Sequence, residues 1–125
     1  MSAKNRVVLL CDDETMIADL LSKLLELEDY KSLIAYNGAD AVKLLIQNKI
    51  DVEVAVVDYH LPDCDGPRLI KMLHEIKPGL PIIMLSGDVG LTLEKVNEMG
   101  AVAYCDKVGD TDRLIEIVNS LLVNR

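Results

Sequence analysis

Carboxylates, a hydroxyl and a lysine follow four of the apolar runs in this sequence. Asp12 and Asp13 come directly after one run, Asp58 closes a second, and Ser86 and Lys107 follow two others. Two carboxylates about 5 Å apart repel by roughly 3 kcal/mol at an effective dielectric near 20, so a cluster of them needs a cation or a bound proton. Together, such residues suit a hard cation such as Mg²⁺ and a phosphoryl group. A carboxylate there could itself be the nucleophile.

Each of these residues also has a simpler interpretation. Strand ends meet water, and acidic residues are common there in a protein with a formal net charge of −8. Any one of them alone is better explained as a surface residue. The conjunction matters only if the fold brings the residues to one place.

The elements that must position them are visible as apolar runs alternating with helical patterns. The runs predict strands at 7–11, 33–36, 52–57, 82–85 and 101–105. Apolar side chains at helical spacing predict helices at 14–28, after the capping residue Asn37, from Gly66 to the Pro78-Gly79 stop, around 93–99, and at 111–123.

This alternation predicts an α/β fold, with a five-stranded parallel sheet and five helices covering both of its faces. Right-handed crossovers favour the strand order 2-1-3-4-5 of a flavodoxin-like, doubly wound sheet. In that order the first and third strands are neighbours, and sites form beyond their carboxyl ends. We expect one domain spanning residues 1–125.

Composition limits the function classes. Thirteen basic against 21 acidic residues argue against direct binding of nucleic acid. No apolar run has the length of a membrane span or of a signal peptide's apolar region, so we expect a cytoplasmic protein without membrane association. The three cysteines lack paired short spacing, which favours reduced thiols. Without Trp or Phe, the core must be aliphatic.

In this order and spacing, the motifs VVLLCDDE, VVDYHLPDCDG, IIMLSGD and VAYCDKVGD resemble the receiver domain of response regulators in two-component phosphorelay signalling, of the chemotaxis-regulator-like kind. The resemblance covers essentially the whole chain. It implies that Asp58 accepts a phosphoryl group, with Lys107 beside it, and that Pro62 and Gly66 shape the loop that leaves Asp58 accessible.

The resemblance also implies a cofactor, partners and a switch. Mg²⁺, with Mn²⁺ as an alternative ion, is expected on Asp13, Asp58 and the backbone carbonyl of His60, with Asp12 acting through water. The phosphodonor is a histidine kinase or a histidine phosphotransfer protein. Such a domain catalyses only its own phosphorylation and dephosphorylation, so it is not an enzyme with an external substrate. After phosphorylation Ser86 is expected to move inward and Tyr104 to follow it.

The sequence departs from the family pattern after the lysine. Receiver domains usually have a proline there, in a cis peptide, whereas Val108 follows Lys107. A cis bond before another residue costs about 2.5–4 kcal/mol, so either the loop is rebuilt with a trans bond or the strain is retained. This departure keeps open a second interpretation, a pseudo-receiver that acts as a phosphorylation-independent interaction module.

Two further features leave alternatives open. The segment between Ser86 and Lys107 is about one residue short, and its helical pattern is the weakest in the chain, which is either loop variation or an altered partner surface. His60 and Asp88 flank the expected phosphoryl position. They either tune the lifetime of the phosphate or are polar residues at a wet rim.

Overall fold

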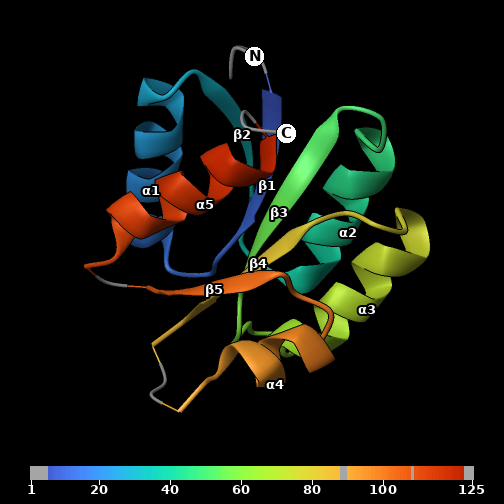
Figure 1. Ribbon diagram of the computed structural model, residues 1–125. Coiled ribbons are helices and arrows are strands. Elements are labelled where there is room, and N and C mark those ends of the chain that lie inside the picture. Colours follow the sequence, from blue (N-terminus) through green and yellow to red (C-terminus); the bar gives the residue numbers. More distant parts are fainter. Residues whose placement is uncertain (1–5, 88–89, 108, 123–125) are drawn as a thin grey trace.

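The computed structural model describes residues 6–87, 90–107 and 109–122. Its five-stranded parallel sheet has the order β2-β1-β3-β4-β5, which confirms the predicted topology (Figure 1). The strands are β1 (Arg6–Cys11), β2 (Tyr30–Ala35), β3 (Val52–Asp58), β4 (Ile82–Ser86) and β5 (Ala103–Asp106). The neighbouring strands β1 and β3 therefore present their carboxyl ends side by side.

Five helices cover the two faces of this sheet, as predicted. They are α1 (Thr15–Leu27), α2 (Gly38–Gln47), α3 (Gly66–Ile76), α4 (Leu93–Glu98) and α5 (Thr111–Leu122). Helices α1 and α5 lie on one face, and α2, α3 and α4 lie on the other (Figure 1). In the part of the chain that the structure describes, none of the helices combines the length and apolarity needed to cross a membrane.

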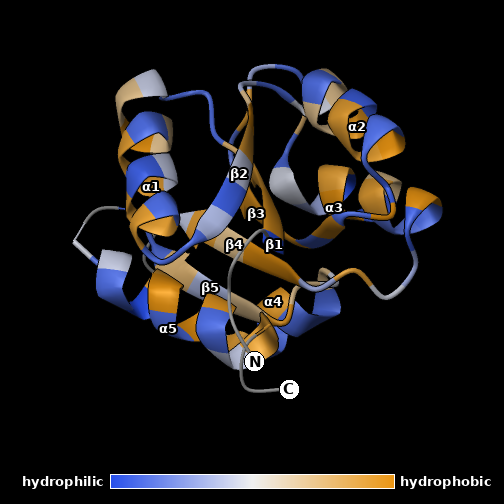
Figure 2. Ribbon diagram, turned by 90° about the horizontal axis from the view of Figure 1, so that it is seen from above, coloured by the Kyte–Doolittle hydropathy of each residue, from blue (hydrophilic) through white to orange (hydrophobic). Residues whose placement is uncertain are grey.

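The core is largely aliphatic and lies on both sides of the sheet. Along β1, Val8 and Leu10 pack in the cluster under α1 and α5, whereas Leu9 and Cys11 pack in the cluster on the opposite face. Both faces are buried, so the central strands are mostly apolar, whereas the helices mix apolar and polar residues and bury an apolar side against the sheet (Figure 2). This packing fixes the strand ends from which the polar side chains project.

Strand β2 begins at Tyr30, three residues before the predicted start at 33. Its polar residues are stabilised by partners that are distant in sequence. The buried Tyr30 hydroxyl donates to Asn119 Oδ1 of α5, and the Ser32 hydroxyl forms a hydrogen bond with that of Ser22 in α1. These contacts allow a strand where the apolar pattern alone is weak.

Helix α4 is the shortest helix, in keeping with the weak pattern in its sequence. Of its six residues only Val96 is buried, and the hydroxyl of the preceding residue, Thr92, accepts from the N–H of Lys95. Asn37 caps α2 as predicted by accepting from the N–H of Asp40.

Candidate functional site

An ammonium group and three carboxylates meet at the carboxyl ends of the strands. Lys107 Nζ, just after β5, lies 2.7 Å from Asp58 Oδ2 at the end of β3 and 3.1 Å from Asp12 Oδ1 after β1. It also forms an ion pair with Glu14. The sheet therefore gathers predicted site residues that lie up to 95 positions apart in sequence.

The site is largely shielded from water. The side chains of Asp12, Asp58 and Lys107 are 0%, 4% and 9% exposed, whereas that of Glu14 is 56% exposed. Burial raises the pKa of Asp12 to about 6, although hydrogen bonds from the Glu14 N–H and Lys107 act in the opposite direction. Burial alone would lower the pKa of Lys107, but its hydrogen bonds to Asp58, Glu14 and Asp12 raise it above its ordinary value.

The backbone around Asp12 fixes the orientation of its carboxylate. Its N–H donates to the Ala35 carbonyl at 3.0 Å, extending the β1–β2 ladder, and its Oδ1 accepts from the Glu14 N–H at 2.9 Å. Its other oxygen, Oδ2, is buried and has no hydrogen-bond partner within the described part of the chain. A buried carboxylate oxygen without a donor is costly, unless a cation or a proton binds to it.

The carboxylates fit a divalent cation. Asp12, Glu14 and Asp58 each offer one oxygen, and these oxygens lie within 4.8 Å of one another. Mg²⁺ takes hard oxygen ligands and is usually held by one or two carboxylates together with waters. The unpartnered Oδ2 of Asp12 is a second indication that the site suits a cation.

The structure brings together Asp12, Asp58 and Lys107 but not Asp13. The side chain of Asp13 is exposed and lies outside the three-carboxylate group, so its role as a direct metal ligand stays a prediction. Glu14 takes part instead, although sequence reasoning gave it no role. The only signal was its position in the run Asp-Asp-Glu after β1, because which of consecutive acidic residues turns inward depends on the turn between β1 and α1.

The loop between β3 and α3 shapes the side of the site next to Asp58. The His60 N–H lies 3.4 Å from Asp58 Oδ1, a long hydrogen bond, and His60 pairs with Asp65 in an isolated antiparallel bridge. At Gly66 a Cβ atom would lie 3.0 Å from Tyr59 Cα and 3.1 Å from the Asp58 carbonyl oxygen. A Cβ at this position would therefore push the start of α3 away from the backbone of the expected phosphoacceptor by a few tenths of an ångström.

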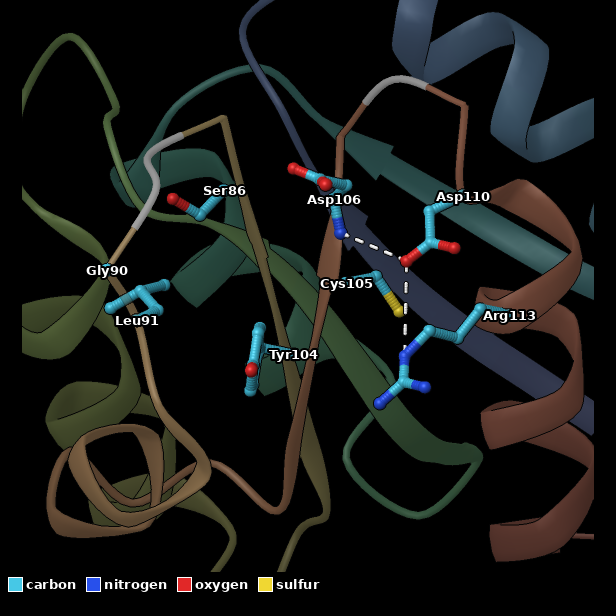
Figure 3. A pocket seen from close by; sticks show the side chains of 8 residues that line it. All are labelled: Ser86, Gly90, Leu91, Tyr104, Cys105, Asp106, Asp110 and Arg113. Carbon is cyan, nitrogen blue, oxygen red and sulfur yellow. Dashed lines mark hydrogen bonds and ion pairs between the residues drawn. The ribbon is translucent and has the colours of Figure 1, made fainter.

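The two predicted switch residues line a common cleft of about 490 Å³ between the ends of β4 and β5 (Figure 3). Ser86 is buried, and its carbonyl accepts from the Lys107 N–H at 3.2 Å. Tyr104 is partly buried and packs against the core cluster that contains Met84. Asp88 and the Lys107–Val108 peptide lie outside the described residues.

Comparison with known proteins gives a consistent result. A family model described as the response regulator receiver domain matches residues 8–119. The transcriptional regulatory protein GlrR of Escherichia coli (strain K12) is 27% identical over 123 residues, which cover 98% of this chain. The chain spans only 27% of the length of that curated relative.

Solved structures with the same fold include the receiver domain of the Francisella response regulator 1452. It is 30% identical, with a TM-score of 0.83 and coverage of 96% of this chain and 98% of that one. The response regulator TrrA from Thermotoga maritima, in complex with Mg²⁺-BeF, is 26% identical with a TM-score of 0.82. That match covers 94% of this chain and 99% of that one.

Proposed function

The chain belongs to the receiver domains of two-component response regulators, and from this premise we propose that it is a signalling switch phosphorylated on Asp58. The observation that carries the proposal is the contact between Asp58 Oδ2, at the exit of a buried strand, and Lys107 Nζ, 2.7 Å away. The donor is a histidine kinase or a histidine phosphotransfer protein. The domain extends over residues 1–125 and acts in the cytoplasm.

Asp58 is the nucleophile in this proposal. One of its carboxylate oxygens attacks the phosphorus of a phosphohistidine, a P–O bond forms, and the P–N bond breaks with its electron pair left on the imidazole. Lys107 stabilises the negative charge on the phosphoryl oxygens, as a fixed ammonium group does in other phosphoryl transfers. Because three carboxylates already hold this ammonium, it needs little reorganisation when the phosphoryl group arrives.

Mg²⁺ binding is supported by the carboxylate group and by the unpartnered Oδ2 of Asp12. When bound, the ion supplies charge neutralisation for the phosphoryl oxygens. Asp58 and Asp13, with the His60 carbonyl, are the predicted ligands, and Asp12 is predicted to act through water. The position of Glu14 in the carboxylate group makes it an additional candidate.

Ser86 and Tyr104 form the proposed switch. A phosphoryl group on Asp58 accepts a hydrogen bond from the Ser86 hydroxyl, which draws the end of β4 inward. The ring of Tyr104 then occupies more of the cleft that both residues line. The phosphoryl group favours this state only by its better contacts there, a difference of about 1–3 kcal/mol for typical coupled sites.

The test is incubation with acetyl phosphate and MgCl₂, followed by intact mass spectrometry. Wild-type protein should gain one phosphoryl group, and Asp58→Asn should gain none. Equal phosphorylation of Asp58→Asn would overturn the choice of residue. A wild-type protein that gains no phosphoryl group, either from acetyl phosphate or from a phosphorylated histidine phosphotransfer protein, would favour the pseudo-receiver instead.

A further inference from the structure

The loop after Asp58 folds back on itself as a small hairpin. His60 and Asp65 form its base, and the Leu61 N–H donates to the Cys64 carbonyl at 3.2 Å. The tip of the hairpin is therefore Pro62-Asp63. Because the hairpin begins two residues after Asp58, its position fixes where the backbone of His60 lies relative to that carboxylate.

The tip of the hairpin is fastened to helix α2 by one side chain. Asp63 Oδ1 accepts from the Gly38 N–H at 2.8 Å, and its Oδ2 accepts from the Ala39 N–H at 2.9 Å. These two donors belong to the first turn of α2, where backbone N–H groups have no partner within the helix. The two hydrogen bonds, from Gly38 and then Ala39, lower the pKa of the Asp63 carboxyl, so it is ionised at neutral pH.

The close fit at this junction leaves no room for a Cβ atom at position 38, the first residue of α2. A Cβ atom at residue 38 would lie 2.5 Å from Cys64 Sγ and 3.3 Å from Asp63 Oδ1. The hairpin thus rests directly on the helix backbone. Asn37 caps the same helix, accepting from the Asp40 N–H at 2.7 Å, but it belongs to the turn before α2 and not to the hairpin.

From these contacts we infer that Asp63 is a positioning residue for phosphorylation, because it fastens the loop that carries His60 to α2. The inference rests on the proposed function of Asp58. Asp63 touches neither Asp58 nor the other carboxylates of the site in any described hydrogen bond. Its effect on metal binding and phosphoryl transfer passes through the hairpin.

The two caps of α2 provide a matched pair of substitutions. Asp63→Ala and Asn37→Ala each remove a side-chain cap from the same helix end, but only Asp63→Ala releases the hairpin. Loss of an outer partner that orients a metal site typically lowers metal affinity 10–100-fold, so we expect a Mg²⁺ dissociation constant about tenfold higher for Asp63→Ala. Asn37→Ala should stay within about twofold of wild type, and Asp63→Asn, which keeps one acceptor oxygen, should lie between.

Titration calorimetry with MgCl₂ measures these affinities, and amide hydrogen exchange without metal measures the loop directly. We expect Asp63→Ala to lose protection at Leu61 and Gly66, whose N–H groups are bonded within the hairpin and at its base, while Asn37→Ala keeps it. Equal protection in both variants, or equal Mg²⁺ affinities, would overturn the inference. Phosphorylation of the wild-type protein is scored separately, since its failure would count against Asp58 while the exchange result still decides the role of Asp63.

Discussion

Removing the Lys107 ammonium group from the buried carboxylates should lower the free energy of unfolding, and the size of this loss should depend on Mg²⁺. At an effective dielectric near 20, the contacts of Lys107 with Asp58 at 2.7 Å and with Asp12 at 3.1 Å correspond to attractions of about 6 and about 5 kcal/mol. Most of this gross attraction offsets the desolvation of the three groups. Breaking a buried pair by removing one partner nevertheless costs about 3–5 kcal/mol, because the remaining charge is uncompensated.

For Lys107→Met we expect a loss of about 3 kcal/mol in the free energy of unfolding at pH 7 in EDTA, near the lower end of that range. The reason is that Asp12, whose pKa is already raised to about 6, relieves part of the repulsion by taking up a proton. Saturating MgCl₂ should restore much of the loss, since the cation replaces the missing positive charge.

Urea unfolding of both proteins, with EDTA or with MgCl₂, measures these differences. The matched control is Lys23→Met on the exposed surface of α1, which should stay within about 0.5 kcal/mol of wild type. A loss below about 1 kcal/mol for Lys107→Met in EDTA would refute the claim that this ammonium balances buried charge. An equal loss with and without MgCl₂ would refute the claim that the carboxylates are a cation site.

Three other measurements address the surroundings of the site. The pKa of Asp12 in the folded protein, about 6, lies above the ordinary value of 3.8. Folding therefore takes up a proton, and the contribution of this residue to the free energy of unfolding falls as the pH rises from about 4 to 6. In EDTA, Asp12→Asn should remove this contribution, at most about 3 kcal/mol, from the decline in the free energy of unfolding. Parallel curves of unfolding free energy against pH for the two proteins would contradict the prediction. Gly66→Ala should lose about 1–3 kcal/mol in urea unfolding, since its Cβ would lie 3.0 Å from a backbone atom, and unchanged stability would contradict this. In native protein treated with a thiol reagent at pH 8, the partly exposed Cys64 should react before the buried Cys11 and Cys105. Burial raises the pKa of all three thiols, so the order of reaction is decided by accessibility, which only Cys64 has.

The architecture was predictable because most of its elements follow one strong pattern. Strands such as β3 are apolar runs interrupted by few polar residues, and helices such as α5 repeat apolar residues every three or four positions. The start of β2 at Tyr30 was not predictable, because its support comes from Asn119 and Ser22 on helices that the local sequence does not specify. Long-range hydrogen bonds of this kind leave no periodic signal.

The site was predictable to the level of strand ends and no further. A parallel sheet places the carboxyl ends of β1, β3 and β5 on the same edge, so topology predicts that Asp12, Asp58 and Lys107 share that edge. Contact also depends on the Lys107 side chain, which reaches past the end of β4 to the two carboxylates. The inward placement of Glu14 depends on backbone angles in the β1–α1 turn. The attachment of Asp63 to α2 likewise depends on the path of a hairpin, and neither is encoded in apolar spacing.

The shortness of α4 has a consequence for how this molecule opens. A helix of six residues, with Val96 as its one buried side chain, has too few hydrogen bonds and too little buried surface to resist separation from the sheet. It should detach many times for every global unfolding event, while the central strands stay paired. Proteases would then cleave the native protein near Lys95 during this local opening, before the central strands separate.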